Sequence, residues 1–109
     1  MSIQKEIIEA TITGNATDQL LWQRTCPTVV NRRVVEVRTC FTGAGKLKLL
    51  RETDEMWADQ KTIQETYKRE DVVDVAWEKG VTIYLYGTDT SGANNPVKVA
   101  LFYEELPAV

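Results

Sequence analysis

Carboxylates are the side chains of this sequence that could do acid–base chemistry. They cluster at Asp54 and Glu55, within residues 70–74, and at Glu104 and Glu105. Glycoside hydrolysis, for example, requires two carboxyl groups that face each other across a cleft. Because neighbouring side chains of a strand point to opposite faces, Glu104 and Glu105 cannot form such a pair by themselves. We therefore interpret these carboxylates as solvated surface groups.

The sequence also contains few side chains that could act as nucleophiles or soft metal ligands. The chain has no histidine and two cysteines, Cys26 and Cys40, so a cysteine nucleophile would lack an imidazole base. No spacing of cysteines corresponds to a zinc or iron site. An intracellular chain would keep both thiols reduced, and a disulfide between them is the alternative. We predict no catalytic residues, no metal and no cofactor, and therefore a protein that is not an enzyme.

The stretch 43–46, "GAGK", has some features of a phosphate-binding loop. Its two glycines are only one residue apart, however, and Leu47 stands where such a loop has the Ser or Thr that contacts magnesium. A turn explains the stretch better, because glycines accept backbone conformations that other residues avoid. We interpret it as a hairpin turn between strands at 33–41 and 46–52.

A polar loop at 87–95, "GTDTSGANN", is the best candidate for holding a small ligand. Calcium sites alternate Asp and Asn oxygens around a turn glycine, but this loop contains a single formal charge. Its carboxylate and amide groups would instead suit the hydroxyl groups of a sugar. The candidate ligand loop consists of Asp89, Asn94 and Asn95.

Two alternating runs, 81–86 and 97–103, flank this loop, and we interpret them as a hairpin. One face of each run is aliphatic and suits a sandwich core. The other face carries two tyrosines and a phenylalanine, which suit interfaces and sugar stacking. The N-terminal arm, the 53–60 loop, a neighbouring subunit or a ligand would cover this face. The candidate interface consists of Tyr84, Tyr86, Phe102 and Trp57.

Period-2 alternation, which is typical of strands, runs through the whole chain. Strands are expected at 6–13, 19–24, 33–41, 46–52, 61–67, 72–77, 81–86 and 97–103. About eight short strands separated by polar or Gly/Pro turns favour an all-β, antiparallel β-sandwich of the jelly-roll type. An immunoglobulin-like sandwich is the alternative, although no tryptophan lies between the two cysteines. Helix is limited to a single turn expected within 52–60.

The bulk composition agrees with one globular domain. The chain has 109 residues, of which 43% are apolar and 27% charged. Its net charge of −3, without a cluster of Lys and Arg, argues against nucleic-acid binding. No run of 18 apolar residues or signal peptide is present, so we expect neither membrane insertion nor export. We assign residues 1–109 to a single β-sandwich domain, with residues 1–5 as a candidate flexible arm.

Two segments carry a resemblance to a known class of proteins. They are the strand–turn–strand "VVEVRTCFTGAGKLKLL" and the terminal "KGVTIYLYGTDTSGANNPVKVALFYEEL". In pattern they resemble the small single jelly-roll proteins of tailed bacteriophage particles, of the decoration (cement) or fibre and baseplate type. The resemblance covers about half of the chain. It implies a homo-oligomer, often a trimer, that binds a capsid or tail protein and catalyses nothing.

The first functional hypothesis is therefore a structural virion protein that stabilises a capsid or tail assembly. It would be made in the host cytoplasm and located in the virion. The second hypothesis is a lectin-like carbohydrate-binding module, located in the cytoplasm. In it Tyr84, Tyr86 or Trp77 would stack on sugar rings, and the candidate ligand loop would bind the hydroxyl groups.

Overall fold

The computed structural model describes residues 2–61 and 67–107, and all of its regular structure is β. The eight strands are β1 (Ser2–Ile12), β2 (Gln19–Thr25), β3 (Val30–Phe41), β4 (Gly45–Arg51), β5 (Asp54–Lys61), β6 (Tyr67–Trp77), β7 (Thr82–Asp89) and β8 (Asn95–Pro107). No helix that could cross a membrane occurs in the described residues.

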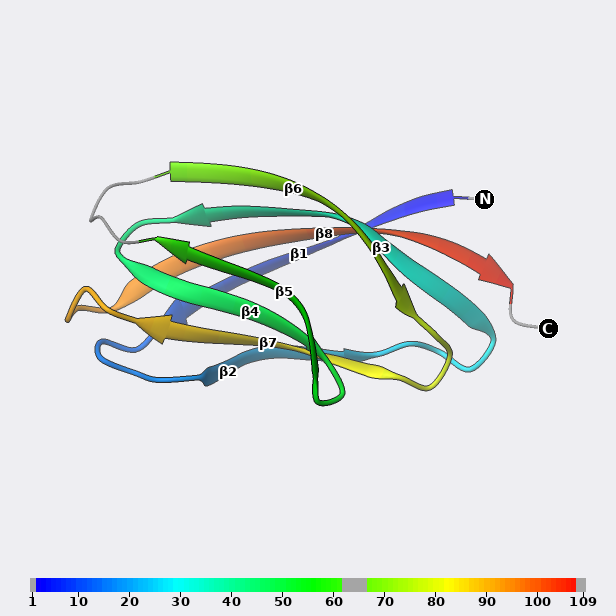
Figure 1. The fold of residues 1–109 in the computed structure, drawn as a ribbon, viewed down its shortest axis with the longest axis horizontal. Helices are drawn as coiled ribbons and strands as arrows, with labels where there is room; N and C mark the ends of the chain where they lie inside the picture. Colours follow the sequence, from blue (N-terminus) through cyan, green and yellow to red (C-terminus); the bar gives the residue numbers. More distant parts are fainter. Residues whose placement is uncertain (1, 62–66, 108–109) are drawn as a thin grey trace.

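The strands form two four-stranded antiparallel sheets, with the orders β1-β8-β3-β6 and β2-β7-β4-β5. The sheets pack face to face in an elongated sandwich of 47 × 22 × 19 Å (Figure 1). Every connection except β4–β5 crosses from one sheet to the other. This order is that of a jelly roll, as expected, and it excludes the immunoglobulin-like alternative.

Alternating side chains explain why these residues form a sandwich. Along β7, buried and partly exposed residues alternate without a break, and β8 does the same over most of its length. Burying one face of each strand removes apolar surface from water, which is the main driving force of folding. The fully buried aliphatic side chains between the sheets include Ile12, Val34, Val37, Leu47, Leu49, Ile83, Leu85, Val99 and Leu101.

The hairpin interpretation of the two last strands is wrong. β7 lies in one sheet and β8 in the other, so their aliphatic faces meet across the core rather than side by side. The "GAGK" turn likewise leads from β3 in one sheet to β4 in the other. A hairpin and a connection between sheets have the same local pattern. The two can be distinguished only by knowing which strands pair with each other in the folded chain.

One further expectation needs revision. The helical turn expected within 52–60 is a strand, because β4 and β5 form a true hairpin there, in which Glu52 adopts a positive φ of 55°. The strand expected at 61–67 falls largely outside the described residues. The structure places residues 2–5, the candidate arm, within β1, where Ser2 is paired with Glu105 of β8.

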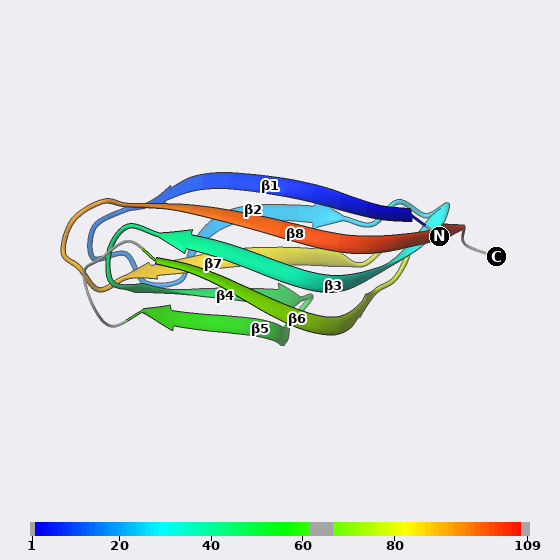
Figure 2. The same ribbon diagram turned by 90° about the horizontal axis from the view of Figure 1, so that it is seen from above.

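Polar side chains bridge the two sheets at both margins of the sandwich. Figure 2 shows β1 and β2 along one margin of the molecule and β5 and β6 along the other. At the β1/β2 margin, Arg24 forms an ion pair with Glu6 at 2.7 Å. Both residues face inward, since their strand neighbours Ile83 and Ile8 are buried. The side-chain amide of Gln19 in β2 also donates a longer hydrogen bond, of 3.4 Å, to the carbonyl of Thr11 in β1, so side-chain contacts link the sheets at this margin.

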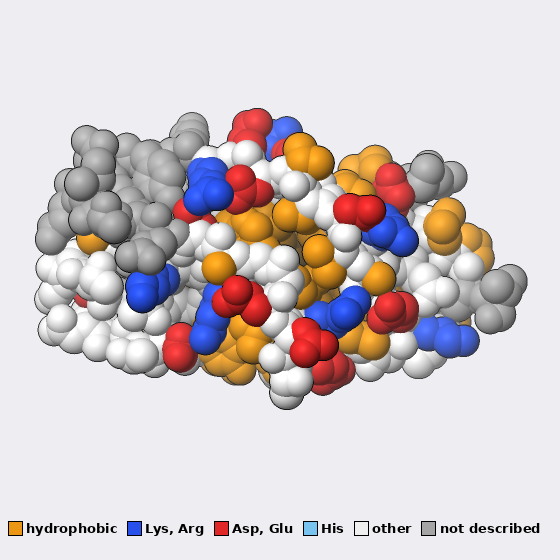
Figure 3. Space-filling view, viewed as in Figure 1, with side chains coloured by type: hydrophobic (Ala, Val, Ile, Leu, Met, Phe, Trp, Pro, Cys, Tyr) orange, Lys and Arg blue, Asp and Glu red, His pale blue; other side chains and the backbone are white. Residues whose placement is uncertain are grey.

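The β5/β6 margin carries a larger bridge. The Trp57 ring N–H donates to Asp71 at 2.7 Å, and Arg69 contacts both Asp71 and the fully buried carboxylate of Asp59, the latter at 2.6 Å. Thr39 donates a further hydrogen bond to Asp59. Figure 3 shows this side of the molecule, with hydrophobic side chains in the middle and charged groups around them. The bridge joins β5 of one sheet to β3 and β6 of the other.

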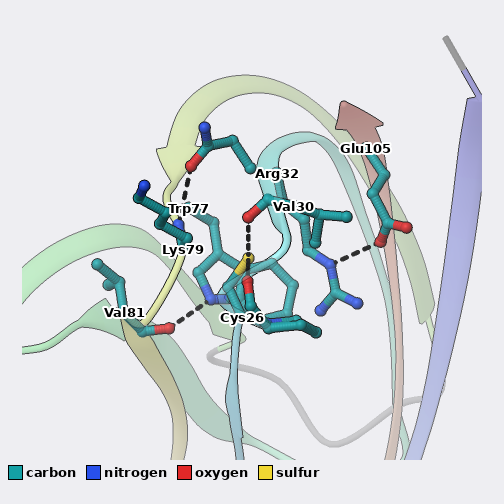
Figure 4. A network of polar contacts seen from close by, with 9 residues as sticks. Cys26, Val30, Arg32, Trp77, Lys79, Val81 and Glu105 are labelled. Atoms are coloured by element: carbon teal, nitrogen blue, oxygen red, sulfur yellow. Dashed lines mark hydrogen bonds and ion pairs between the residues drawn. The ribbon is translucent and has the colours of Figure 1, made fainter. Parts of the chain in front are cut away.

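One end of the sandwich is closed by Arg32. Its guanidinium lies 4.6 Å from the ring centres of both Trp77 and Tyr103 and forms an ion pair with Glu105 at 2.9 Å (Figure 4). The Trp77 ring N–H donates to the carbonyl of Val81. An arginine held between two aromatic faces gains cation–π attraction while its charge stays paired. Trp77, which is 1% exposed, is thus a core residue rather than a sugar-stacking one.

Cys26 lies in the same cluster and is fully buried. Its thiol lies 3.4 Å from the carbonyl oxygen of Val30 (Figure 4). Burial raises the pKa of the Cys26 thiol, and this effect outweighs the opposing charge of Arg32. Cys26 and Cys40 are both free thiols.

Candidate functional site

The two tyrosines of β7 lie on the outer face of the β2-β7-β4-β5 sheet. Tyr84 and Tyr86 alternate with the buried Ile83 and Leu85, so they point away from the core. Their rings stack with centres 6.2 Å apart and an interplanar angle of 29°. Leu20 of β2, opposite Tyr86, is 47% exposed. These side chains form an aromatic and apolar strip across the middle of this sheet.

A groove of about 440 Å³ opens beside Tyr86 on this outer face. Thr17, Asp18, Lys48, Ala58 and Thr88 are among the residues that line it. The ammonium group of Lys48 lies 5.8 Å from the ring centre of Tyr86 and 3.1 Å from an oxygen of Asp18. The groove therefore offers one ring face, one ion pair and several hydroxyl groups, which suits the binding of a polar ligand.

The structure does not bring the four residues of the candidate interface together. Phe102 lies on the outer face of the other sheet, where the guanidinium of Arg38 covers its ring at 4.6 Å. Trp57 is 8% exposed and belongs to the core beside Leu49. Of the four residues, Tyr84 and Tyr86 are the two that lie next to each other.

The outer face of the β1-β8-β3-β6 sheet carries most of the strongly exposed apolar side chains. Ile3 and Ile7 of β1, Val72 of β6 and Leu106 of β8 are between 46% and 88% exposed. The register places Val72 and Phe102 on either side of Glu36 of the intervening strand β3. Charged neighbours such as the ion pair of Arg38 with Glu36 separate these apolar groups. The face is therefore a mixed surface in which exposed apolar and charged side chains alternate.

The candidate ligand loop is hydrogen-bonded to two other turns of the fold. Asn95 is 1% exposed, and its side-chain amide bonds to Gly43 and Ala44 in the turn between β3 and β4. Asn94 accepts a hydrogen bond from the backbone N–H of Gly14. Asp89, which is 4% exposed, accepts one from the backbone N–H of Asn15. Of the three loop residues, Asn94 alone is exposed to a ligand.

The carboxylate of Asp89 is the centre of this arrangement. It also accepts hydrogen bonds from the backbone N–H groups of Ser91 and Gly92 and from the Ser91 hydroxyl, the last at 2.6 Å. Burial by itself would raise the pKa of Asp89. The bonds from Ser91, Asn15 and Gly92 outweigh burial and hold this pKa far below the ordinary range. Asp89 is therefore ionised and structurally engaged.

The buried carboxylates of these sites are engaged in the fold. Among the residues that the structure describes, no group of three or more Cys, Asp and Glu side chains could hold a metal ion. The best-buried carboxylates, Asp59 and Asp89, are occupied by donors of the protein itself. The sequence interpretation missed Lys48, Asp18 and Leu20 around Tyr86. The alternation of "KLKLL" placed Lys48 on an outer face. It could not show that Asp18 and Tyr86, which are distant in the sequence, lie beside Lys48.

Comparison with known proteins identifies the architecture. No family model and no curated protein sequence matches the chain. A chain of the cyanophage Pam1 capsid asymmetric unit is similar in structure, with a TM-score of 0.61 and 12% identity over 93% of this chain and 83% of that chain. This protein has the jelly-roll fold.

Two further solved structures share the fold. The CBM36-1 domain of a multidomain xylanase from the hindgut metagenome of the termite Trinervitermes trinervoides has a TM-score of 0.55 and 10% identity, over 93% of this chain and 97% of that chain. The globular domain of zebrafish complement 1qA has a TM-score of 0.53 and 11% identity, over 88% and 94%. Structural similarity at identities this low shows a common architecture only. The function has to be argued from the surface residues of this chain.

Proposed function

We propose that this chain is a non-enzymatic structural protein of a bacteriophage particle, which binds a capsid or tail protein as a homo-oligomer and stabilises the assembly. The observation that carries this proposal is the exposed apolar group on the outer face of the β1-β8-β3-β6 sheet, namely Ile3, Ile7, Val72 and Leu106. It lies on a fold that a cyanophage capsid chain shares over most of its length. The protein would act in the virion.

Stabilisation would follow from binding the assembled lattice and not its dissociated subunits. A ligand that binds one state of an equilibrium stabilises that state by mass action. Repeated contacts on a symmetric particle would add avidity to contacts that are individually weak. The mixed surface around Phe102, with paired charges between apolar groups, suits such a modest contact.

The test is the presence of the protein in banded particles from the strain that carries its gene, by mass spectrometry and immunogold labelling. Val72→Asp should lower the amount retained on particles, because Val72 is 88% exposed and its substitution leaves the core intact. Val29→Asp is the matched control, since Val29 is 71% exposed but lies in the loop before β3. Absence of the protein from the particles would refute the virion function.

A second candidate function is carbohydrate binding on the outer face of the other sheet. The stacked tyrosines and the groove beside Tyr86 favour it, because sugar rings pack on aromatic faces while their hydroxyls bond to polar side chains. Lys48, Asp18 and Thr88 would supply those polar contacts. The likeness of this fold to the CBM36-1 domain of a multidomain xylanase supports this candidate.

A glycan array that includes xylo-oligosaccharides tests this alternative. Tyr86→Ala should abolish any binding, whereas Phe102→Ala, on the opposite sheet, should leave it unchanged. An array without a bound glycan, or equal binding by both variants, would remove the carbohydrate hypothesis.

A further inference from the structure

The edge of the β1-β8-β3-β6 sheet that β1 forms presents backbone groups that the functions above do not use, although Ile3 and Ile7 of this strand belong to the exposed apolar group of the proposed function. β1 pairs with β8 on one side, and among the described residues no strand pairs with its other side. Figure 2 shows β1 along one margin of the molecule, with no other strand beyond it. An unpaired edge presents a row of backbone N–H and C=O groups to which another strand can bond.

β1 has no bulge, which is one of the features by which edge strands avoid such pairing, although it carries Lys5, Glu9 and the inward-facing Glu6. Its register with β8 runs without interruption from Ser2↔Glu105 to Ile12↔Asn95. The ladders of the other three edge strands, β2, β5 and β6, each contain a register shift. Bulges twist an edge away from a partner, whereas a long continuous edge with exposed apolar side chains invites one. β1 is therefore the edge best suited to continue its sheet.

The charges of β1 fit a second copy of the same strand. Its outer face carries Ile3, Lys5, Ile7, Glu9 and Thr11 in that order. If two antiparallel copies pair about a two-fold axis at Ile7, Lys5 of each copy lies opposite Glu9 of the other. Ile7 then meets Ile7 of the partner subunit. Directly opposed unlike charges and apolar pairs both stabilise strand pairing.

Other registers lose this complementarity. A two-fold axis at Lys5 or at Glu9 would oppose two like charges. A shift by a single residue would place the core-facing side of one copy beside the outer face of the other. The contact of Glu9 with Lys98 at 3.3 Å is exposed, with side chains 71% and 58% accessible, so it does not prevent Glu9 from approaching a second lysine.

We propose that two copies of this chain associate through their β1 edges, antiparallel and centred on Ile7, with a continuous sheet of four strands from each copy. Such an interface uses the same surface on both subunits and closes at two copies. We thus expect a dimer where the virion resemblance implies a trimer. This inference rests on the homo-oligomer of the proposed function, but it needs no particle.

A charge-exchange series in sedimentation equilibrium tests the register. Lys5→Glu and Glu9→Lys should each raise the dissociation constant of the dimer about tenfold or more, because two attractive pairs become repulsive. The double variant, with both substitutions, should restore association because the two charges have only changed places. Lys79→Glu, in the exposed turn before β7, has the same charge change as Lys5→Glu and should have no effect.

Cross-linking supplies a second measurement. In a Cys40→Ser background, Ile7→Cys should form a disulfide-linked dimer with oxidised glutathione, since the two thiols would face each other across the axis. Thr11→Cys, on the same face of β1, would lie opposite Ile3 of the partner subunit and should not cross-link.

Each outcome decides the inference. A strict monomer, a trimer, single charge variants that associate normally, or a double variant that stays dissociated would each overturn it. A β1 dimer that is absent from phage particles would keep this inference and refute the virion function. A monomer found in particles would do the reverse.

Discussion

At the scale of single residues, the position on a strand decides whether a reactive or charged side chain is exposed to solvent. Cys26 is fully buried with a raised pKa, whereas Cys40 is partly exposed on β3. Arg32 and Arg33 are neighbours in sequence, yet Arg32 is enclosed between aromatic rings and Arg33 pairs with Asp74 at the surface. These contrasts provide matched pairs for experiment.

The two thiols should differ in their reaction with a disulfide reagent at pH 8. Thiolate is the reactive form, and burial disfavours it at Cys26. In the native protein Cys40 should react first and Cys26 only after unfolding, as measured by absorbance of the released thiol. Cys40→Ser should therefore remove the fast phase, and Cys26→Ser should retain it. Two equally fast phases in the wild type would contradict the buried position.

Arg32→Ala should lower the free energy of unfolding by about 3 kcal/mol, because it removes a partly buried ion pair and leaves Glu105 uncompensated. Arg33→Ala, which removes an exposed pair, should cost about 0.5 kcal/mol or less. Urea unfolding followed by tryptophan fluorescence measures both, and Trp77 lies at the affected site. Equal losses in the two variants would show that Arg32 contributes no more to stability than the exposed pair of Arg33.

At the scale of elements, the loop between β7 and β8 is joined by side-chain hydrogen bonds to two other turns, β1–β2 and β3–β4. A long loop that crosses between sheets loses more conformational entropy than a tight turn, and its polar groups need partners. Asp89 and Asn95 supply those partners from buried positions. The loop is thus a structural support for this end of the sandwich.

Asp89→Ala should destabilise the protein by about 3 kcal/mol, because several backbone N–H donors lose a charged acceptor at once. Asn94→Ala, in the same loop, removes an exposed acceptor of a single N–H group and should cost about 1 kcal/mol or less. Thermal unfolding by circular dichroism measures the difference. If Asn94→Ala were the more harmful change, the central role of Asp89 would be refuted.

At the scale of the whole molecule, the bridge at the β5/β6 margin connects two sheets that share no backbone pairing there. The hydrogen bond from Trp57 lowers the pKa of Asp71, burial opposes this, and Arg69 adds to the lowering. A carboxyl group whose pKa is lowered by folding contributes stability above its unfolded pKa. That contribution is lost as the pH falls through its folded pKa.

Asp71→Asn should therefore cost about 1–2 kcal/mol at pH 7, and the difference from wild type should shrink below about pH 4, where the unfolded carboxyl group binds a proton. Urea unfolding at a series of pH values measures this difference. Asp74→Asn is the control, since Asp74 is 75% exposed at the surface of the same strand. A difference for Asp71→Asn that stays constant down to pH 3 would contradict the bridge.

Alternation in the sequence was sufficient to predict the fold class and much of the core. The residues Ile83, Leu85, Val99 and Leu101 are buried as their period-2 pattern indicates, because a strand exposes only one side to the core. The same pattern placed Tyr84 and Tyr86 on an outer face. The candidate interface could be predicted only in part, since Phe102 and Trp57 required knowledge of which sheet each strand joins.

The sequence by itself thus determined which side of each strand is buried and that the chain is an antiparallel β-sandwich. The tertiary structure alone decided how the strands pair. It placed β7 and β8 in opposite sheets, separated the tyrosines from Phe102, engaged Asp89 in the fold and left the β1 edge unpaired. The physical reason is that side-chain alternation is local. Strand pairing, in contrast, depends on contacts between residues far apart in the chain.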